Sequence, residues 1–221
     1  MRSTSQRVIS HKDEAYKWRR MMLGENMYNG AYYYSQELTD NIIPSIKTDR
    51  SWITINYREG CDHSILIVHD NVMFEQTYDF MQRYDDVIYV VSLPDMIERA
   101  EKFGRVIYLP MSVDVEYVRT FRRKKDRDTA FCGRAEWMQM SSDSIPNTAD
   151  VISGLPRTRF LQEMARYRNV YAVCRVAIEA KILGCNVLPT HPRFPNPDIF
   201  EVIDNSEAAM MLQTELDKID R

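Results

Sequence analysis

Residues 171–188 read Tyr171-Ala-Val-Cys-Arg-Val-Ala-Ile-Glu-Ala-Lys-Ile-Leu-Gly-Cys-Asn-Val-Leu188, and this stretch decides the fold. A short β-branched run leads into a helix rich in Ala, Leu and Ile, which Gly184 ends, and a second apolar run follows at once. The stretch therefore predicts a strand, a crossover helix and a second strand. Glu179 lies inside this largely apolar helix, and it needs a partner because burying an unpaired carboxylate is costly.

Strand-like and helix-like segments alternate along most of the chain. Short apolar runs predict strands at 52–56, 64–68, 87–91, 105–109, 128–132, 151–153 and 169–173, and around Val187. Longer periodic segments predict helices at 14–23, 33–46, 78–84, 94–103, 114–123, 157–167 and 206–219, the last with Ser206 as its N-cap. This alternation indicates parallel sheets built from βαβ units.

Two such sets of strands are joined near residues 119–128. We therefore expect an α/β protein with two small Rossmann-like domains and a cleft between them. Residues 1–118 should form the N-terminal domain, residues 119–127 a basic linker and residues 128–221 the C-terminal domain. In such sheets ligands bind beyond the carboxyl ends of the strands, so functional side chains should directly follow strands.

The composition excludes several classes of protein. The 221 residues are 44% hydrophobic and 28% charged with a net charge of −3, which argues against a dedicated nucleic-acid binder. No P-loop and no GxGxxG occurs, which removes the commonest ATPase and dehydrogenase classes. Four scattered cysteines without CxxC spacing predict neither disulfides nor a zinc site. With no leader and no membrane-spanning run, we expect a cytoplasmic protein.

Basic residues follow three of the predicted strands. Gly133 and Arg134 come directly after strand 128–132, and Arg175 opens the helix that contains Glu179. After strand 151–153, Gly154-Leu-Pro-Arg157 opens the next helix. Arginine suits phosphate because its planar fork can bind two oxygens at once. These residues are candidate phosphate ligands, although for Arg157 a solvated first helical turn is the alternative.

Together these segments resemble the donor domain of GT-B glycosyltransferases, through Gly133-Arg134 and through residues 179–187. The latter are similar to the family's Glu-Ala-hydrophobic-x-x-Gly-x-x-Val element, with Lys181 at the hydrophobic position. The resemblance implies that Glu179 binds the ribose of a nucleotide-sugar donor. It further implies that the donor diphosphate meets basic residues and a helix N-terminus, with these donor-binding residues: Gly133, Arg134, Gly154, Arg157 and Arg175. Tyr171 to Cys174 stand where many members carry an earlier glutamate followed by glycines.

The N-terminal half should supply the acceptor side. His69 and Asp70 follow strand 64–68, and an imidazole beside a carboxylate can act as general base toward an acceptor hydroxyl. The alternative is a turn in which both residues only cap the next segment. Asn29, Gly30 and Tyr32 lie in a segment that resembles the turn and helix start facing the acceptor. This tyrosine-rich segment could equally be a packing surface or a homodimer contact.

The resemblance implies transfer of a sugar from a nucleotide-sugar donor to a hydroxyl of a glycan, a lipid-linked acceptor or DNA. It implies no metal and no cofactor, because basic residues and helix N-termini stabilise the leaving diphosphate in this family. One alternative is a non-catalytic module that binds a nucleotide or nucleotide sugar. Another is a DNA-modifying glycosyltransferase, with the basic run 119–127 against DNA rather than serving as a solvated linker.

Overall fold

The computed structural model describes residues 8–9, 30–53, 61–68, 83–134 and 144–220. The chain is an α/β protein with two parallel sheets, as the sequence predicts. Its contacts divide it into two compact units, and the expected cleft between them stays a prediction. The first unit consists of Met1–Met22, Ser35–Pro110 and Ser206–Arg221, and the second of Leu23–Tyr34 and Met111–Asn205.

The limits of these units differ from the domain boundaries expected from the sequence. The contacts group residues 111–118 with the second unit and the C-terminal helix with the first. Val113 forms a parallel β-bridge with Asp204, which holds its segment in the second unit. The C-terminal helix is tied to the first unit, where Lys47 N–H donates to Gln213 and Arg105 donates to the Ile219 carbonyl.

The sheet of the first unit has five strands in the order β1-β2-β3-β4-β5, and every neighbouring pair is parallel. The strands are β1 (Val8–Ile9), β2 (Ser51–Ile53), β3 (Ser64–Val68), β4 (Val87–Val91) and β5 (Arg105–Tyr108). All residues of β3 and β4 are buried, as expected for central strands of a parallel sheet that are covered on both faces. Four of these strands were predicted; β1 was not.

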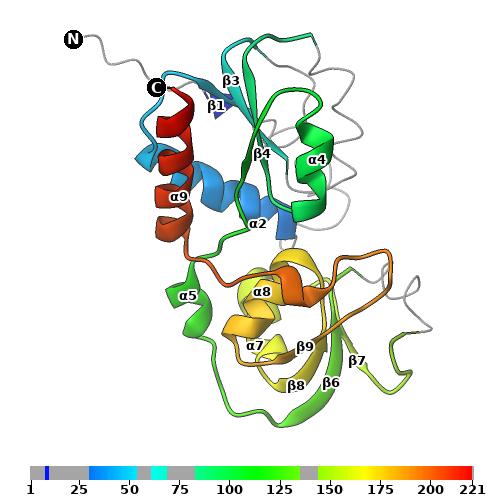
Figure 1. Cartoon of the computed structure of the whole chain (residues 1–221). Coiled ribbons are helices and arrows are strands. Elements are labelled where there is room, and N and C mark those ends of the chain that lie inside the picture. Colours follow the sequence, from blue (N-terminus) through cyan, green and yellow to red (C-terminus); the bar gives the residue numbers. More distant parts are fainter. Residues whose placement is uncertain (1–7, 10–29, 54–60, 69–82, 135–143, 221) are drawn as a thin grey trace. The chain divides into compact units, whose positions relative to one another are not determined.

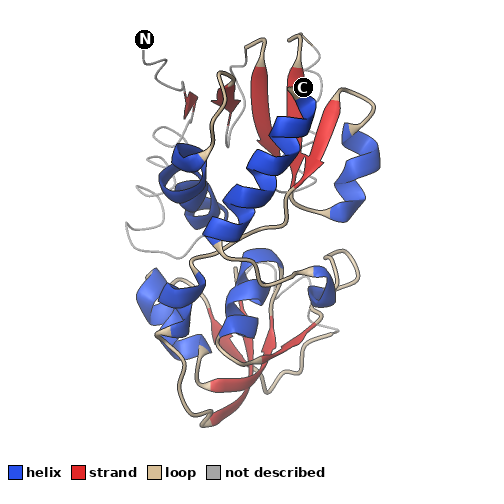
Figure 2. Cartoon of the chain, turned by 60° about the vertical axis from the view of Figure 1, so that its left-hand side comes forward, coloured by secondary structure: helices blue, strands red, loops and turns tan. Residues whose placement is uncertain are grey.

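The described part of the first unit also contains short helices and one long helix. They are α2 (Gly30–Glu37), continued by a π-turn η1 (Leu38–Ile42) and a 3-10 turn η2 (Ile43–Ser45); η3 (Pro94–Met96) with α4 (Ile97–Ala100); and α9 (Asn205–Ile219). Residues 30–34 of α2 group with the second unit. Helix α9 lies beside the first sheet in both views (Figures 1 and 2). Because α9 begins at Asn205, Ser206 lies in its first turn rather than at its N-cap. The predicted helices 14–23 and 78–84 lie wholly or largely outside the described residues.

The sheet of the second unit has four parallel strands in the order β7-β6-β8-β9. They are β6 (Arg127–Cys132), β7 (Asp150–Ile152), β8 (Tyr167–Tyr171) and β9 (Asn186–Leu188). The helical segments are α5 (Val115–Arg119), α7 (Arg157–Met164), α8 (Cys174–Ile182) and η4 (Pro197–Ile199). The strand–helix–strand unit predicted from residues 171–188 is thus confirmed as β8, α8 and β9.

The order of the strands decides which face each helix covers. Right-handed crossovers place α7 and α8 on the same face, because β7 to β8 and β8 to β9 move in the same direction. The connection from β6 to β7 moves in the opposite direction and therefore covers the other face. There Phe131 packs with Ile145 and Ala149, and Tyr171 from the neighbouring strand packs against them.

Helix α8 ends where the sequence predicts. Gly184 adopts a left-handed φ of 76°, which costs glycine nothing because it has no Cβ. Its N–H donates to the Lys181 carbonyl, and the next N–H, of Cys185, donates to the Ala180 carbonyl. This pattern is a Schellman motif, which satisfies the last carbonyls of the helix and turns the chain into β9.

Candidate functional site

The carboxyl edge of the second sheet contains a topological switch point. Strands β6 and β8 are neighbours, but β6 leads to β7 on one side and β8 leads to β9 on the other. A crevice at such a point is where open α/β sheets bind ligands. Gly133 and Arg134 directly follow β6, and a side chain at Gly133 would come within 3.1 Å of the Phe131 ring. The motif thus lies at the carboxyl edge of the sheet, as its place after a strand predicts.

The helices α7 and α8 begin at the same edge of the sheet. Neither α7 nor α8 has a side-chain cap or an acidic residue in its first turn. Each instead has an arginine there, Arg157 at the first position of α7 and Arg175 at the second position of α8. A positive side chain in this place opposes the helix dipole, while a negatively charged group is favoured by the dipole and by the amides of the first turn. The arrangement therefore suits a negatively charged group.

The carboxylate of Glu179 binds both of these arginines. Arg175 Nε donates to Glu179 Oε1 over 3.0 Å, and Arg157 Nη2 lies 3.4 Å from the same oxygen. The side chain of Glu179 is 0% exposed, against 2% for Arg175 and 13% for Arg157. Arg175 Nη1 also donates to the Ser112 carbonyl over 3.5 Å. The sequence required a partner for Glu179, and the structure supplies two partners within the same unit. We call Arg157, Arg175 and Glu179 the arginine–glutamate cluster.

Two tyrosine rings, each from another element of the second unit, contact the guanidinium of Arg157. Its guanidinium carbon lies 4.6 Å from the ring centroid of Tyr33 and 5.1 Å from that of Tyr117. Cation–π contacts at these distances are attractive and favour one orientation of the guanidinium. The sequence placed Tyr33 in the tyrosine-rich segment that either faces the acceptor or serves as a packing or dimer surface, and it did not indicate the contact with Arg157. Nothing near Tyr117 pointed to Arg157.

The first residue of α8 has an unusual backbone. Cys174 has a φ of 50°, a left-handed conformation that residues with a side chain adopt at a cost. It belongs to the segment where the resemblance expects glycines. Gly154, which precedes α7, also has a positive φ, of 65°. A residue with left-handed backbone thus lies at or shortly before the start of each of these two helices.

Several predicted site residues are not tested by this geometry. His69, Asp70 and Asn29 lie outside the described residues. Gly30 and Tyr32 belong to α2, in the part that groups with the second unit, although the sequence assigned them to the N-terminal domain. Their roles toward an acceptor stay predictions.

The basic run 119–127 lies inside the second unit rather than between the two units. Lys125 Nζ donates to the carbonyls of Ala165 and Leu183, each over 2.9 Å, at the ends of α7 and α8. Arg122 donates to the Ile182 carbonyl at the end of α8. Cations are favoured at helix C-termini, where carbonyls lack partners within the helix. Part of the run thus has a structural role that the sequence did not indicate.

An Asp-x-Asp triplet, Asp126 to Asp128, lies at the opposite, amino edge of this sheet, around the start of β6. Both carboxylate oxygens of Asp126 accept hydrogen bonds from Arg166 over 3.1 Å. Among the described residues, no group of three or more His, Cys, Asp or Glu side chains is arranged to hold a metal ion. All four cysteines are free thiols.

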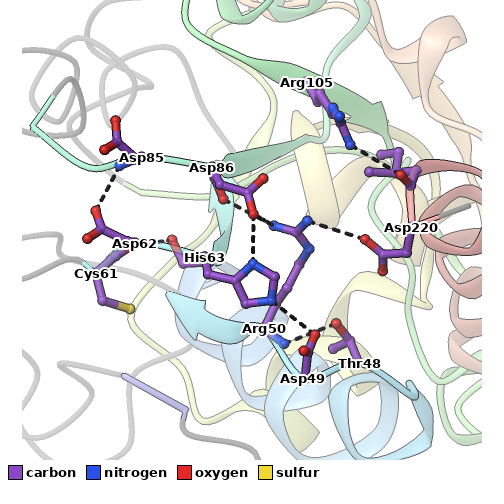
Figure 3. A network of polar contacts seen from close by, with 12 residues as sticks. Thr48, Asp49, Arg50, Cys61, Asp62, His63, Asp85, Asp86, Arg105 and Asp220 are labelled. Atoms are coloured by element: carbon purple, nitrogen blue, oxygen red, sulfur yellow. Dashed lines mark hydrogen bonds and ion pairs between the residues drawn. The ribbon is translucent and has the colours of Figure 1, made fainter.

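A second polar cluster lies in the first unit, before strands β2, β3 and β4 (Figure 3). His63 Nδ1 lies 2.7 Å from Asp86 Oδ2, and His63 Nε2 lies 3.0 Å from Asp49 Oδ1. Arg50, only 4% exposed, binds Asp86 and, over 3.2 Å, Asp220 at the end of α9. We call these five residues the histidine cluster.

The histidine cluster favours a charged imidazole. Both ring nitrogens face carboxylates, and only the protonated ring can donate from both. Hydrogen bonds to Asp86 and then Asp49 raise the pKa of His63, and the bond to His63 lowers the pKa of Asp86 and of Asp49. The cluster lies at the amino edge of its sheet, opposite the edge where ligands bind. Its geometry therefore indicates a structural role, in which it links the starts of β2, β3 and β4 to the end of α9.

In the parts of the chain that the structure describes, no helix has the length and apolar character needed to cross a membrane. Comparisons with protein-family models, with curated proteins and with solved structures gave no match to this chain. Any functional conclusion therefore depends on the geometry of the second unit and on the sequence elements that build it.

Proposed function

We propose that the second unit binds the diphosphate of a nucleotide sugar, and that the chain is a small, metal-independent glycosyltransferase of the GT-B type. The observation that carries the proposal is the pair of uncapped helix N-termini at the switch-point edge, each with an arginine in its first turn. Arg134, which follows β6, adds a third basic residue to this edge. Amides and arginines together form a favourable environment for phosphate oxygens.

The sugar-nucleotide part of the proposal comes from the Glu-Ala-hydrophobic-x-x-Gly-x-x-Val element. In the proposed reaction, Arg134, Arg157 and Arg175 offset the negative charge that develops on the leaving diphosphate. His69, with Asp70 beside it, takes the proton from the acceptor hydroxyl. No metal is needed for these roles, because the positive charge comes from side chains and helix N-termini.

A binding module without transfer activity is the second candidate. It is favoured by the burial of Glu179, whose carboxylate is 0% exposed and engaged by two arginines. A unit of this kind keeps a phosphate site while it offers no accessible carboxylate to a donor ribose. DNA modification receives less support, because Arg122 and Lys125 of the basic run bind helix ends inside the second unit.

The test is calorimetry with UDP-, GDP- and ADP-glucose, together with an assay of donor hydrolysis and of transfer to simple glycan acceptors. We expect one donor to bind, and Arg134→Ala to weaken it about tenfold or more, as for loss of a charge-assisted hydrogen bond. Arg168→Ala, which removes an exposed arginine on β8, is the matched control and should leave binding unchanged. Binding with turnover supports the enzyme, and binding alone supports the module. Absence of both contradicts the two proposals.

A further inference from the structure

The role of Glu179 follows from its surroundings in the second unit, and it differs from a direct contact with ribose. Its carboxylate is 0% exposed, and one oxygen, Oε1, accepts from both Arg175 and Arg157. A ribose hydroxyl that reached this oxygen would have to displace at least one guanidinium. The displaced guanidinium would be a buried charge without its ionic partner, so the exchange is unfavourable.

The same carboxylate explains how two arginines can lie in the first turns of adjacent helices. Arg157 and Arg175 oppose the dipoles of α7 and α8, and they also repel each other. Glu179, one turn into α8, offsets this repulsion and links the beginnings of both helices. Its contacts fix the Nε edge of Arg175 and one Nη2 group of Arg157.

Two aromatic rings complete the hold on Arg157. Tyr33 comes from α2 and Tyr117 from α5, with centroids 4.6 Å and 5.1 Å from the guanidinium carbon. Arg157 is 13% exposed, more than either of its ionic neighbours in the cluster. Arg157 is therefore both tightly positioned and the member of the cluster that an incoming anion reaches first.

We infer that Glu179 is a positioning residue that holds Arg157 and Arg175 for the diphosphate and does not bind the ribose, with Tyr33 and Tyr117 setting the orientation of Arg157. This inference rests on the proposed function. It predicts that the loss of Glu179 weakens only the binding of the phosphates, because the base and the ribose make no contact with its carboxylate.

The first experiment compares wild type with Glu179→Gln, using inorganic pyrophosphate and the diphosphates UDP, GDP and ADP as calorimetric probes. If Glu179 positions the arginines, the variant weakens pyrophosphate and the best nucleoside diphosphate by the same factor, about tenfold. If Glu179 binds ribose, the nucleoside diphosphate weakens while pyrophosphate binding stays the same. That second result overturns the inference.

A second pair of variants keeps the inference testable if Glu179→Gln does not fold. Tyr117 is 36% exposed, so its replacement should be tolerated. Tyr117→Leu removes the ring beside Arg157 and should weaken pyrophosphate about two- to fivefold, the range of an exposed cation–π contact. Tyr117→Phe keeps the ring and should restore the affinity. Equal affinity of wild type and Tyr117→Leu for pyrophosphate overturns the inference.

The two levels of failure can be told apart. If wild type binds neither pyrophosphate nor any nucleotide, the proposed function itself fails, and the inference fails with it. In the other case, wild type binds nucleotides, and Glu179→Gln weakens nucleoside diphosphate binding while it leaves pyrophosphate binding unchanged. The proposed function then stands, and Glu179 is a ribose ligand.

Discussion

The arginine–glutamate cluster of the second unit and the histidine cluster of the first unit use similar charges in different places. The first is almost fully buried and lies where α7 and α8 begin, at the carboxyl edge of its sheet. The second lies before the strands, and its His63 and Asp86 side chains are 46% and 47% exposed. Burial makes the first cluster costly to break, while solvent weakens the second. The two clusters have similar charged residues. They differ in the edge of the sheet at which they lie and in their burial, and these two properties distinguish a candidate ligand site from a structural ion-pair network.

The largest expected effect is on Glu179, because its removal leaves two arginines without their shared carboxylate. Glu179→Leu should lower the free energy of unfolding by about 3–5 kcal/mol, the usual cost of breaking a buried ion pair from one side. The triple variant Arg157→Met, Glu179→Leu, Arg175→Met should recover most of this stability and lose pyrophosphate binding. Urea unfolding measures the first effect and calorimetry the second. A loss below about 1 kcal/mol for Glu179→Leu would mean that the cluster is not buried as described.

A smaller effect is expected for Arg50, the buried member of the histidine cluster. Arg50→Met should cost about 1–3 kcal/mol, because it removes charge-assisted bonds to Asp86 and Asp220. Hydrogen exchange should accelerate in the last turn of α9, which Asp220 follows. Lys218→Met is the matched control, since Lys218 pairs with Glu215 on the same helix surface. Equal exchange in both variants would show that Arg50 does not fasten α9.

Two adjacent lysines of the second unit allow a charge that binds helix ends to be compared with an exposed one. Lys125 donates to two carbonyls at helix ends, whereas Lys124 is exposed. Lys125→Met should lower the free energy of unfolding by about 1–2 kcal/mol, and Lys124→Met by a few tenths at most. Thermal unfolding compares the two. Similar losses would contradict a capping role for Lys125.

The smallest effect is the pH dependence of the histidine cluster. The pKa of His63 is raised above its ordinary value of 6.5, so its contribution to stability is complete below that pH and is lost as the pH rises through the folded pKa. The pKa of Asp86 is lowered from 3.8, so its contribution is present above that value and is lost as the pH falls through the folded pKa. The cluster therefore stabilises most between these two values.

His63→Asn tests this dependence, because Asn tolerates the φ of 54° at this position. The stability difference between wild type and variant should be about 0.2–1 kcal/mol at pH 5.5 and should shrink by pH 8.5. A difference that is constant with pH would contradict a charged His63 in the folded protein.

Sequence reasoning succeeded where local pattern determines structure. The apolar runs at 64–68 and 87–91 predicted β3 and β4 with the observed bounds, because strands buried on both faces need continuous apolar residues. Gly184 predicted the end of α8, because only a residue that tolerates positive φ allows that turn. Gly133-Arg134 directly follows β6 and so lies at the carboxyl edge of the sheet, as predicted, while its role toward a phosphate stays a prediction.

Sequence reasoning failed where the partner is distant in the chain. An amphipathic pattern predicted a helix at 206–219 but cannot say which core it covers, and α9 groups with the first unit. The need of Glu179 for a partner was evident, but its pairing with Arg157 joins two helices that are separated by a strand in the chain. The cation–π contacts of Arg157 join residues from three segments and have no local signature.

The most direct test of the account is a crystal structure of the protein soaked with the nucleotide sugar that binds best in solution. The account predicts density for the diphosphate at the N-terminus of α8, within reach of Arg134 and Arg157, with Glu179 still bound to both arginines of its cluster. A diphosphate found elsewhere on the molecule, or a donor ribose in contact with the Glu179 carboxylate, would contradict it.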